Sequence, residues 1–316
     1  MSKIVIENAA KMATRDGYGK ALLALGKEND FVVLCADLSD PTRTVAFEKE
    51  YPDRFIQCGI AEGNMMSVAA GIATTGKVAF ASTFAIFAAG RAYEQIRNSI
   101  AYPHLNVKIG ATHAGLSVGE DGATHQCIED LALMRVIPGM TVLSPCDGPE
   151  TMRATEAALE IDGPVYIRIG RSAVETVSSP DVPFVPGKGI VLAEGKDTVI
   201  IATGLMVGEA LGAHKILAER GIDAGVINIH TIKPMDDALL AEVAKKYDHI
   251  FTAEEHSVIG GLGAAVLESI SEVAPVKVTR IGVEDQFGRS GPANAVLAAY
   301  GLDAASIADR VEKALK

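Results

Sequence analysis

The sequence is poor in aromatic and basic residues. It contains no tryptophan, only 5% of its 316 residues are aromatic, and 29 lysines and arginines stand against 40 acidic residues, for a formal charge of -11. A surface that binds nucleic acid needs a basic stripe to displace counterions from phosphates. The composition therefore argues against a nucleic-acid partner, and it makes any cluster of aromatic rings conspicuous.

Cysteine pairs and long apolar segments are also missing. The four cysteines, at positions 35, 58, 127 and 146, show no CxxC spacing, and cells normally keep such thiols reduced. No run approaches the roughly 18 apolar residues of a membrane span, and the first residues lack a charged region followed by an apolar one. We therefore expect a cytoplasmic protein with buried thiols and no membrane partner.

Short apolar runs alternate with longer helical patterns along the chain. Runs such as "DFVVLCAD", "KVAFASTF" and "NVKIGAT" are typical of buried parallel strands covered by helices. Three prolines in "SAVETVSSPDVPFVPGKG" interrupt the alternation, which then resumes. We predict an α/β fold with two domains, each a mostly parallel sheet with helices on both faces: residues 1–175, a linker at 176–190, and residues 191–316.

Residues that follow the strands are the functional candidates, because ligands of open parallel sheets bind beyond the carboxyl ends of the strands. Glu62 follows "FIQCGI" and begins a helix of small residues. An acid in a first helical turn is stabilised by free amides, by roughly 0.3 to 1 kcal/mol. Helix capping is therefore one explanation of Glu62, and contact with a ligand is the other.

Two rings follow the next strand. Phe84 and Phe87 lie three residues apart in "STFAIFAAGRAYEQI", a spacing that lets both rings share one side of a helix. A core stripe is the ordinary explanation, but two large rings just past a strand end can equally wall a flat heterocycle.

A polar, glycine-rich segment lies between two histidines. His113 and His125 flank "AGLSVGEDGAT", which carries Glu120 and Asp121. Imidazoles beside carboxylates can exchange protons near neutral pH. A solvated loop and a metal site are the alternatives, but without a short HxxxH pair or a zinc-type cysteine pair we assign no metal ligands.

Two arginines complete the candidate set. Arg15 follows "KMAT" and Arg171 ends "VYIRIGR", so both flank predicted sheet elements. Either can be a plain surface charge, and either can hold a phosphate through two hydrogen bonds.

Together these segments resemble the C-terminal half of transketolase, the thiamine-diphosphate enzyme that moves two-carbon ketol units between sugar phosphates. The resemblance spans the whole chain and rests on "ADL" at 36–38, "GIAEGNM" at 59–65, "STFAIF" at 82–87 and "VGEDGATHQCIED" at 118–130. It implies a pyrimidine-binding domain followed by the transketolase C-terminal domain. It also implies a transferase of the pentose phosphate pathway that uses thiamine diphosphate and Mg²⁺.

The resemblance gives cofactor roles to five residues. Glu62 is implied to hydrogen-bond the aminopyrimidine ring nitrogen of the cofactor and to share a proton with it. Phe87 is implied to stack on the same ring. The further cofactor contacts that it implies come from Asp37, Leu38 and Phe84.

Substrate roles follow in the same way. The resemblance matches His113 and Asp121 to contacts with substrate hydroxyls, and His125 to a catalytic group near the donor hydroxyl and carbonyl. It matches Arg15 and Arg171 to ligands of the sugar phosphate.

The diphosphate motif of the family is missing. Family members carry GDG followed about 25 to 30 residues later by Asn, which together hold the diphosphate through magnesium, an ion that prefers oxygen ligands. No GDG occurs in this sequence. The resemblance therefore implies a separate N-terminal subunit that binds the diphosphate and mainly holds the Mg²⁺. It also implies self-association through the C-terminal domain and a heterotetramer with two copies of each chain.

Some positions depart from the family pattern. Ala61 stands where transketolases commonly have Arg, and Gly90 stands where a third aromatic residue is usual. Ala61 before Glu62 is similar to the pattern of 1-deoxyxylulose-5-phosphate synthase, whereas Gln126 after His125 favours transketolase. The loop "ADLSDPTRT" is one residue longer than that of the family, which leaves three candidates for its phosphate-binding hydroxyl: Ser39, Thr42 and Thr44.

Three functional hypotheses follow. The first is a transketolase subunit that is active only with its partner. The second is a relative that uses pyruvate, another 2-oxoacid or another ketol donor. The third is a non-catalytic module that keeps the fold. The natural pair of sugar phosphates is left open.

Overall fold

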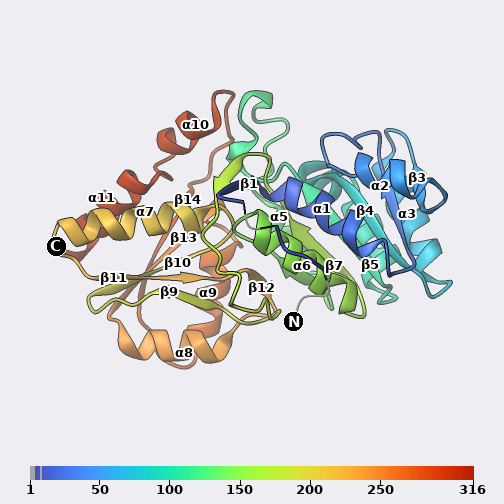
Figure 1. The fold of residues 1–316 in the computed structure, drawn as a ribbon. Coiled ribbons are helices and arrows are strands. Elements are labelled where there is room, and N and C mark those ends of the chain that lie inside the picture. Colours follow the sequence, from blue (N-terminus) through green and yellow to red (C-terminus); the bar gives the residue numbers. More distant parts are fainter. Residues whose placement is uncertain (1–3, 8) are drawn as a thin grey trace.

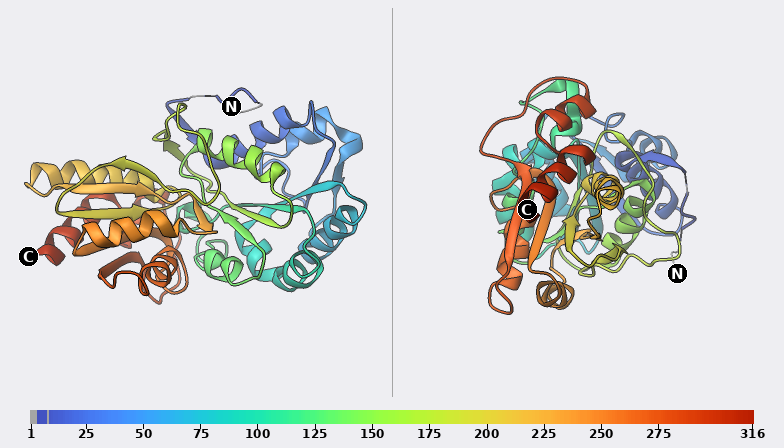
Figure 2. Two further views of the ribbon diagram at one scale, coloured as in Figure 1. Left: turned by 90° about the horizontal axis from the view of Figure 1, so that it is seen from below. Right: turned by 90° about the vertical axis from the view of Figure 1, so that its left-hand side faces the viewer.

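The computed structural model describes residues 4–7 and 9–316. The chain forms two lobes, each built on a sheet, which lie side by side in Figures 1 and 2. Residues 176–189, all of them described, contain neither helix nor strand and connect the two lobes. The predicted fold class, α/β with mostly parallel sheets flanked by helices, is confirmed.

The first lobe contains a seven-stranded sheet in the order β12-β6-β7-β5-β4-β2-β3. The six strands from β2 to β7 run parallel, and β12 is antiparallel to β6. The strands are β2 (Phe31–Cys35), β3 (Phe55–Gln57), β4 (Val78–Phe84), β5 (Val107–Thr112), β6 (Thr141–Leu143), β7 (Val165–Arg168) and β12 (Thr231–Lys233).

Helices cover both faces of this sheet because its central strands are apolar on both sides. Alternate residues of β2 enter different cores: Val33 packs with α1 and α6, and Leu34 packs with α3. The helical segments of this lobe are α1 (Thr14–Leu25), α2 (Val45–Glu50), η1 (Pro52–Arg54), α3 (Glu62–Ala73), η2 (Ile86–Arg91), α4 (Tyr93–Gln95), η3 (Ile96–Ala101), η4 (Leu116–Asp121), α5 (Asp130–Arg135) and α6 (Gly148–Glu160).

The second lobe is built on a five-stranded sheet in the order β14-β13-β10-β11-β9, in which only β9 is antiparallel to its neighbour. Its strands are β9 (Ile190–Ala193), β10 (Thr198–Ala202), β11 (Ala224–Asn228), β13 (His249–Ser257) and β14 (Lys277–Val283). Its helices are α7 (Met206–Glu219), α8 (Asp237–Lys246), α9 (Leu262–Ile270), α10 (Ala293–Ala299) and α11 (Ala304–Leu315).

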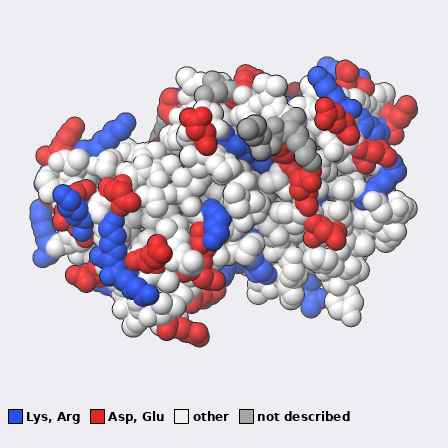
Figure 3. Space-filling view, turned by 60° about the horizontal axis from the view of Figure 1, so that its bottom comes forward, with Lys and Arg blue, Asp and Glu red and all other residues white. Residues whose placement is uncertain are grey.

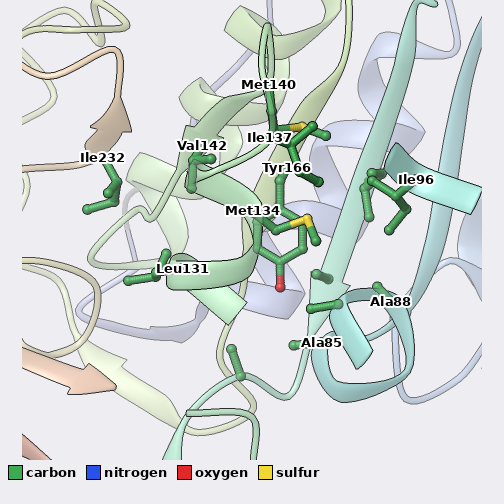
Figure 4. Packing of buried hydrophobic residues seen from close by; sticks show 14 of the residues in the cluster. Ala85, Ala88, Ile96, Leu131, Met134, Ile137, Met140, Val142, Tyr166 and Ile232 are labelled. Atoms are coloured by element: carbon green, nitrogen blue, oxygen red, sulfur yellow. The ribbon is translucent and has the colours of Figure 1, made fainter. Parts of the chain in front are cut away.

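The two lobes share a core and part of a sheet. One cluster of buried side chains includes Leu131 and Val142 of the first lobe and Ile201 and Leu240 of the second. Figure 4 shows this junction, with Ile232 of β12 facing Leu131 and Val142. A further two-stranded ribbon pairs β1 (Lys11–Ala13) with β8 (Ala173–Glu175).

Charges of both signs are mixed on the surface. On the face shown in Figure 3, basic and acidic side chains intermingle at the two ends of the molecule, with mostly uncharged residues between them. Within the described residues, no helix combines the length and the apolar character that crossing a membrane requires.

Candidate active site

Four rings gather beyond the carboxyl ends of β4 and β5. Phe84 stacks on His113 with ring centroids 3.8 Å apart, and on Phe87 with centroids 5.7 Å apart and ring planes 15° apart. His125 lies edge-on to both phenylalanines. The prediction that Phe84 and Phe87 share one side of a helix is wrong for Phe84, which is the last residue of β4, but the rings are neighbours all the same.

The segment that carries Phe87 has an unusually wide helical turn. Residues of η2 form i to i+5 hydrogen bonds, such as the one from the Ala92 N–H to the Phe87 carbonyl at 3.0 Å. Turns of this kind are rare and occur often at functional sites. The wide turn places Arg91 over the Phe87 ring, with its guanidinium carbon 4.6 Å from the ring centroid.

Glu62 is the first residue of α3, and its side chain is only 2% exposed. The preceding residue, Ala61, makes no side-chain cap hydrogen bond. Arg91 donates from Nη1 to both carboxylate oxygens of Glu62, each at 3.1 Å. Acid, guanidinium and ring therefore form one unit at the start of α3.

His113 is buried and carries no charge at neutral pH. It follows β5 with a left-handed backbone (φ 59°), and its Nδ1 lies 3.0 Å from the Thr112 hydroxyl. Burial, followed by the nearby positive charges of Arg15 and Arg171, lowers the pKa of His113 to about 3. A neutral imidazole can act on a substrate hydroxyl as a hydrogen-bonding group rather than as a cation.

Three arginines create a positive region near His113. Burial and the neighbouring Arg43 lower the pKa of Arg15, whose buried Nε has no hydrogen-bond partner in the described part of the chain. Arg43 pairs with Asp16 at 2.8 Å, and Arg171 pairs with Glu120 at 2.9 Å. The Arg15 Nε is thus a buried donor whose hydrogen bond is unused within the described residues.

The remaining predicted residues lie in the segments that follow β2 and β5. Asp37 is exposed, has φ 59°, and donates its backbone N–H to the Gln57 side chain at 2.7 Å. Leu38 is half-buried and follows it directly. Asp121 ends η4 and is exposed.

The structure separates the three loop hydroxyls. Thr42 and Thr44 are fully buried, and their hydroxyl oxygens lie 3.1 Å apart. Thr42 also donates to the Leu38 carbonyl at 2.7 Å. Ser39 is half-buried and accepts a hydrogen bond from the Gln57 side chain. Ser39 is therefore the loop hydroxyl that a ligand reaches most easily.

The second lobe supports the loop between the two histidines. Gln126 donates from its amide to the carbonyls of Leu116 and Arg289, at 3.0 and 2.9 Å. A side chain at Gly122 would overlap the Ser290 hydroxyl, which shows how closely the segment before α10 approaches. Figure 1 shows α10 beside this loop.

Sequence reasoning missed Arg91 and Arg43. Both stand inside segments that attracted attention for other residues, "STFAIFAAGRAYEQI" and "ADLSDPTRT". A signal existed for Arg91, because an arginine four residues after an aromatic residue can reach its ring on a helix. Arg43 has φ 64°, which no sequence pattern indicated.

The described residues contain no group of three or more His, Cys, Asp or Glu side chains able to hold a metal ion. Two family descriptions match the chain: "Transketolase, pyrimidine binding domain" over residues 10–176, and "Transketolase, C-terminal domain" over residues 187–307. The chain belongs to the transketolase family. Its two domains are those of the C-terminal half of transketolase, so the identification made from the sequence motifs is confirmed.

Individual relatives agree. The chain is 51% identical, over 96% of both proteins, to a protein of Methanocaldococcus jannaschii described as a transketolase C-terminal section. It is 42% identical to a 6-deoxy-6-sulfo-D-fructose transketolase subunit of a Clostridium species, over 93% of this chain and 91% of that subunit. A solved structure described as a split gene transketolase, inactive beta4 tetramer, has 56% identity and a TM-score of 0.90, over 96% of this chain and 98% of that one.

Proposed function

We propose that this chain is the pyrimidine-binding subunit of a split transketolase. It transfers a two-carbon ketol unit from a ketose phosphate to an aldose phosphate, together with a separate subunit that binds the diphosphate and Mg²⁺. The observation that carries the proposal is the buried Glu62 at the start of α3, which Arg91 links to the Phe87 ring.

The residues present fit the aminopyrimidine half of thiamine diphosphate. An aminopyrimidine can stack on an aromatic face and hydrogen-bond an acid at its edge, and Phe87 and Glu62, both in contact with Arg91, are groups of these two kinds. Phe84 extends the aromatic face, and Asp37 and Leu38 are the further proposed cofactor contacts. When bound, the cofactor supplies the carbon that carries the ketol unit.

The chain's own residues then orient the substrate and hold or move protons at the cofactor and the substrate. Glu62 holds a proton at the aminopyrimidine ring nitrogen. His125 lies edge-on to both phenylalanines and moves a proton at the donor hydroxyl and carbonyl. The neutral His113 and the exposed Asp121 orient the substrate hydroxyls.

The positive region selects a sugar with a terminal anion. Arg15 and Arg171 are the proposed phosphate ligands, and the buried, unpartnered Nε of Arg15 supports this assignment. Ser39 is the proposed hydroxyl of the neighbouring loop. A sulfonate has a similar tetrahedral shape, and one relative is described as a 6-deoxy-6-sulfo-D-fructose transketolase subunit. The substrate assay should therefore compare sugar phosphates with sulfo-sugars.

Assembly completes the proposal. We assign residues 1–175 to the pyrimidine domain, 176–190 to the linker and 191–316 to the C-terminal domain. The C-terminal domain is the proposed surface for self-association, giving a heterotetramer with the diphosphate-binding subunit. A relative of known structure described as a beta4 tetramer supports self-association of such chains.

The test combines this chain with a diphosphate-binding subunit, thiamine diphosphate and Mg²⁺, and measures ketol transfer between sugar phosphates. Glu62→Gln should lower the rate by at least about 100-fold, because it removes the proton-sharing acid. Glu94→Gln changes an exposed acid of α4 in the same way and is the control. An unimpaired Glu62→Gln complex contradicts the mechanism, and release of CO₂ from pyruvate in the same mixture favours the pyruvate-using alternative.

A further inference from the structure

Arg91 makes the same two contacts that the proposed cofactor ring requires. Its guanidinium lies 4.6 Å from the centroid of the Phe87 ring, and its Nη1 donates to both oxygens of Glu62 at 3.1 Å. A guanidinium is flat, delocalised and rich in N–H donors. Phe87 thus has a planar group over it, and the buried Glu62 has a donor at its edge.

An aminopyrimidine ring has matching properties. It is flat, it stacks on an aromatic face, and its protonated ring nitrogen donates to a carboxylate. We propose that Arg91 is an internal stand-in for this ring: it occupies Glu62 and Phe87 until the aminopyrimidine of thiamine diphosphate displaces it. This inference rests on the proposed function, and it adds a competition within the chain for the cofactor's own contacts.

The geometry lets Arg91 leave while Glu62 stays. The Arg91 side chain is 55% exposed, whereas that of Glu62 is 2% exposed and fixed at the start of α3. Arg91 is the last residue of η2, and it uses one nitrogen for both hydrogen bonds. Its long side chain can turn outward and place the charge in water.

The arrangement has a use in a subunit whose site is completed by another chain. A buried acid without a partner is costly, and Arg91 supplies the partner from within the chain. Binding of the aminopyrimidine then exchanges one set of contacts for an equivalent set. The two contacts given up by the half-exposed Arg91, its ion pair with Glu62 and its cation–π contact with Phe87, together correspond to about a tenfold change in a binding constant.

The competing role is that of a positioning residue, in which Arg91 orients Glu62 for the cofactor and stays in place. The two roles predict opposite changes in cofactor affinity when Arg91 is removed. If Arg91 competes, its removal tightens cofactor binding. If Arg91 positions Glu62, its removal weakens binding.

The first experiment measures the Mg²⁺-dependent Kd of thiamine diphosphate by calorimetry, with the chain assembled with its diphosphate-binding subunit. Arg91→Leu should lower the Kd by about tenfold. Arg91→Lys should give a smaller decrease, because lysine keeps the positive charge but lacks the planar guanidinium. Arg97→Leu removes an exposed arginine of η3 that bonds Asn98, and it should leave the Kd unchanged.

An Arg91→Leu complex with an unchanged or higher Kd overturns the inference. A wild-type complex that binds no thiamine diphosphate overturns the proposed function, and the inference falls with it. The two failures are therefore distinguishable in one titration series.

A second experiment needs no cofactor. Thermal unfolding of the chain alone is compared for wild type, Arg91→Leu, Glu62→Gln and the double variant. Non-additive changes in stability are expected, because residues in direct contact couple in a double-mutant cycle. Additive changes show that Arg91 and Glu62 do not hold each other in the subunit, and they overturn the stand-in role.

Discussion

The molecule contains two carboxylate–arginine pairs that share their chemistry and differ in their surroundings. Asp130 and Arg168 lie where the two lobes meet, with side chains 0% and 5% exposed and separations of 3.0 and 3.1 Å. Asp130 also accepts a hydrogen bond from Tyr166 at 2.9 Å. Glu62 is equally buried, but its arginine is more than half exposed.

The number of partners separates the two pairs. Arg168 donates to Asp130 through Nε and to the Glu255 carbonyl through Nη2 at 2.8 Å, and the field of Asp130 raises its pKa despite burial. We call this pair closed, because both of its side chains are buried and hydrogen-bonded to further protein groups. The Glu62 pair is open toward solvent, so one of its members can be exchanged. Closure distinguishes a structural ion pair from one available for function.

The largest expected effect comes from breaking the closed pair. Arg168→Met should lower the free energy of unfolding by about 3 to 5 kcal/mol, because it leaves Asp130 buried without its counterion. Arg91→Leu, at the open pair, should cost less, because water can take the place of the half-exposed guanidinium beside the Glu62 carboxylate. Urea unfolding followed by circular dichroism measures both. Equal losses would erase the distinction between the pairs.

A smaller effect concerns pH at the same junction. Burial raises the pKa of Glu255 to about 7, against the opposing influence of Arg168. A folded-state pKa above the unfolded value contributes stability below pH 4.5, which is lost as the pH rises through 7. Glu255→Gln should therefore destabilise less at pH 8 than at pH 5, by at most about 3 kcal/mol. Unfolding curves at both pH values test this, and a pH-independent difference contradicts it.

The smallest effect is the response to salt. Screening weakens exposed charge pairs much more than buried ones. The coupling between Glu62 and Arg91, at most about 1 kcal/mol at low salt, should therefore shrink in 1 M NaCl. The coupling between Asp130 and Arg168 should hold. Double-mutant cycles at two salt concentrations make the comparison, and a salt-sensitive Asp130–Arg168 coupling would show that water reaches the junction.

Much of the fold was predictable because its signals are local. Buried parallel strands form continuous apolar runs, so "DFVVLCAD" and "NVKIGAT" indicated β2 and β5 directly. Glu62 was recognised from the apolar run before it and from the family motif around it. The structure pairs it with Arg91, which lies over the Phe87 ring, while its role toward a cofactor stays a prediction.

The rest depended on geometry that spacing rules do not contain. Phe84 was predicted on a helix, because a three-residue spacing does not show where a strand ends. The four-residue spacing from Phe87 to Arg91 permits their contact, but the wide turn of η2 and the ion pair of Arg91 with Glu62, 29 residues away, are not visible in that spacing. The sequence did not distinguish Thr42 and Thr44 from Ser39 as candidates for the phosphate-binding hydroxyl, because burial inside a loop depends on contacts distant in sequence.

The short strand β12 has a consequence for how the chain unfolds. It comes from the lobe after residue 190, yet it pairs with β6 and covers an edge of the other lobe's sheet. A sheet edge left bare exposes unpaired N–H and C=O groups that invite pairing with other chains. Because removing the second lobe would strip this edge and open the shared core, the two lobes should melt together as one cooperative unit, and a cut in the linker should not release two independently stable halves.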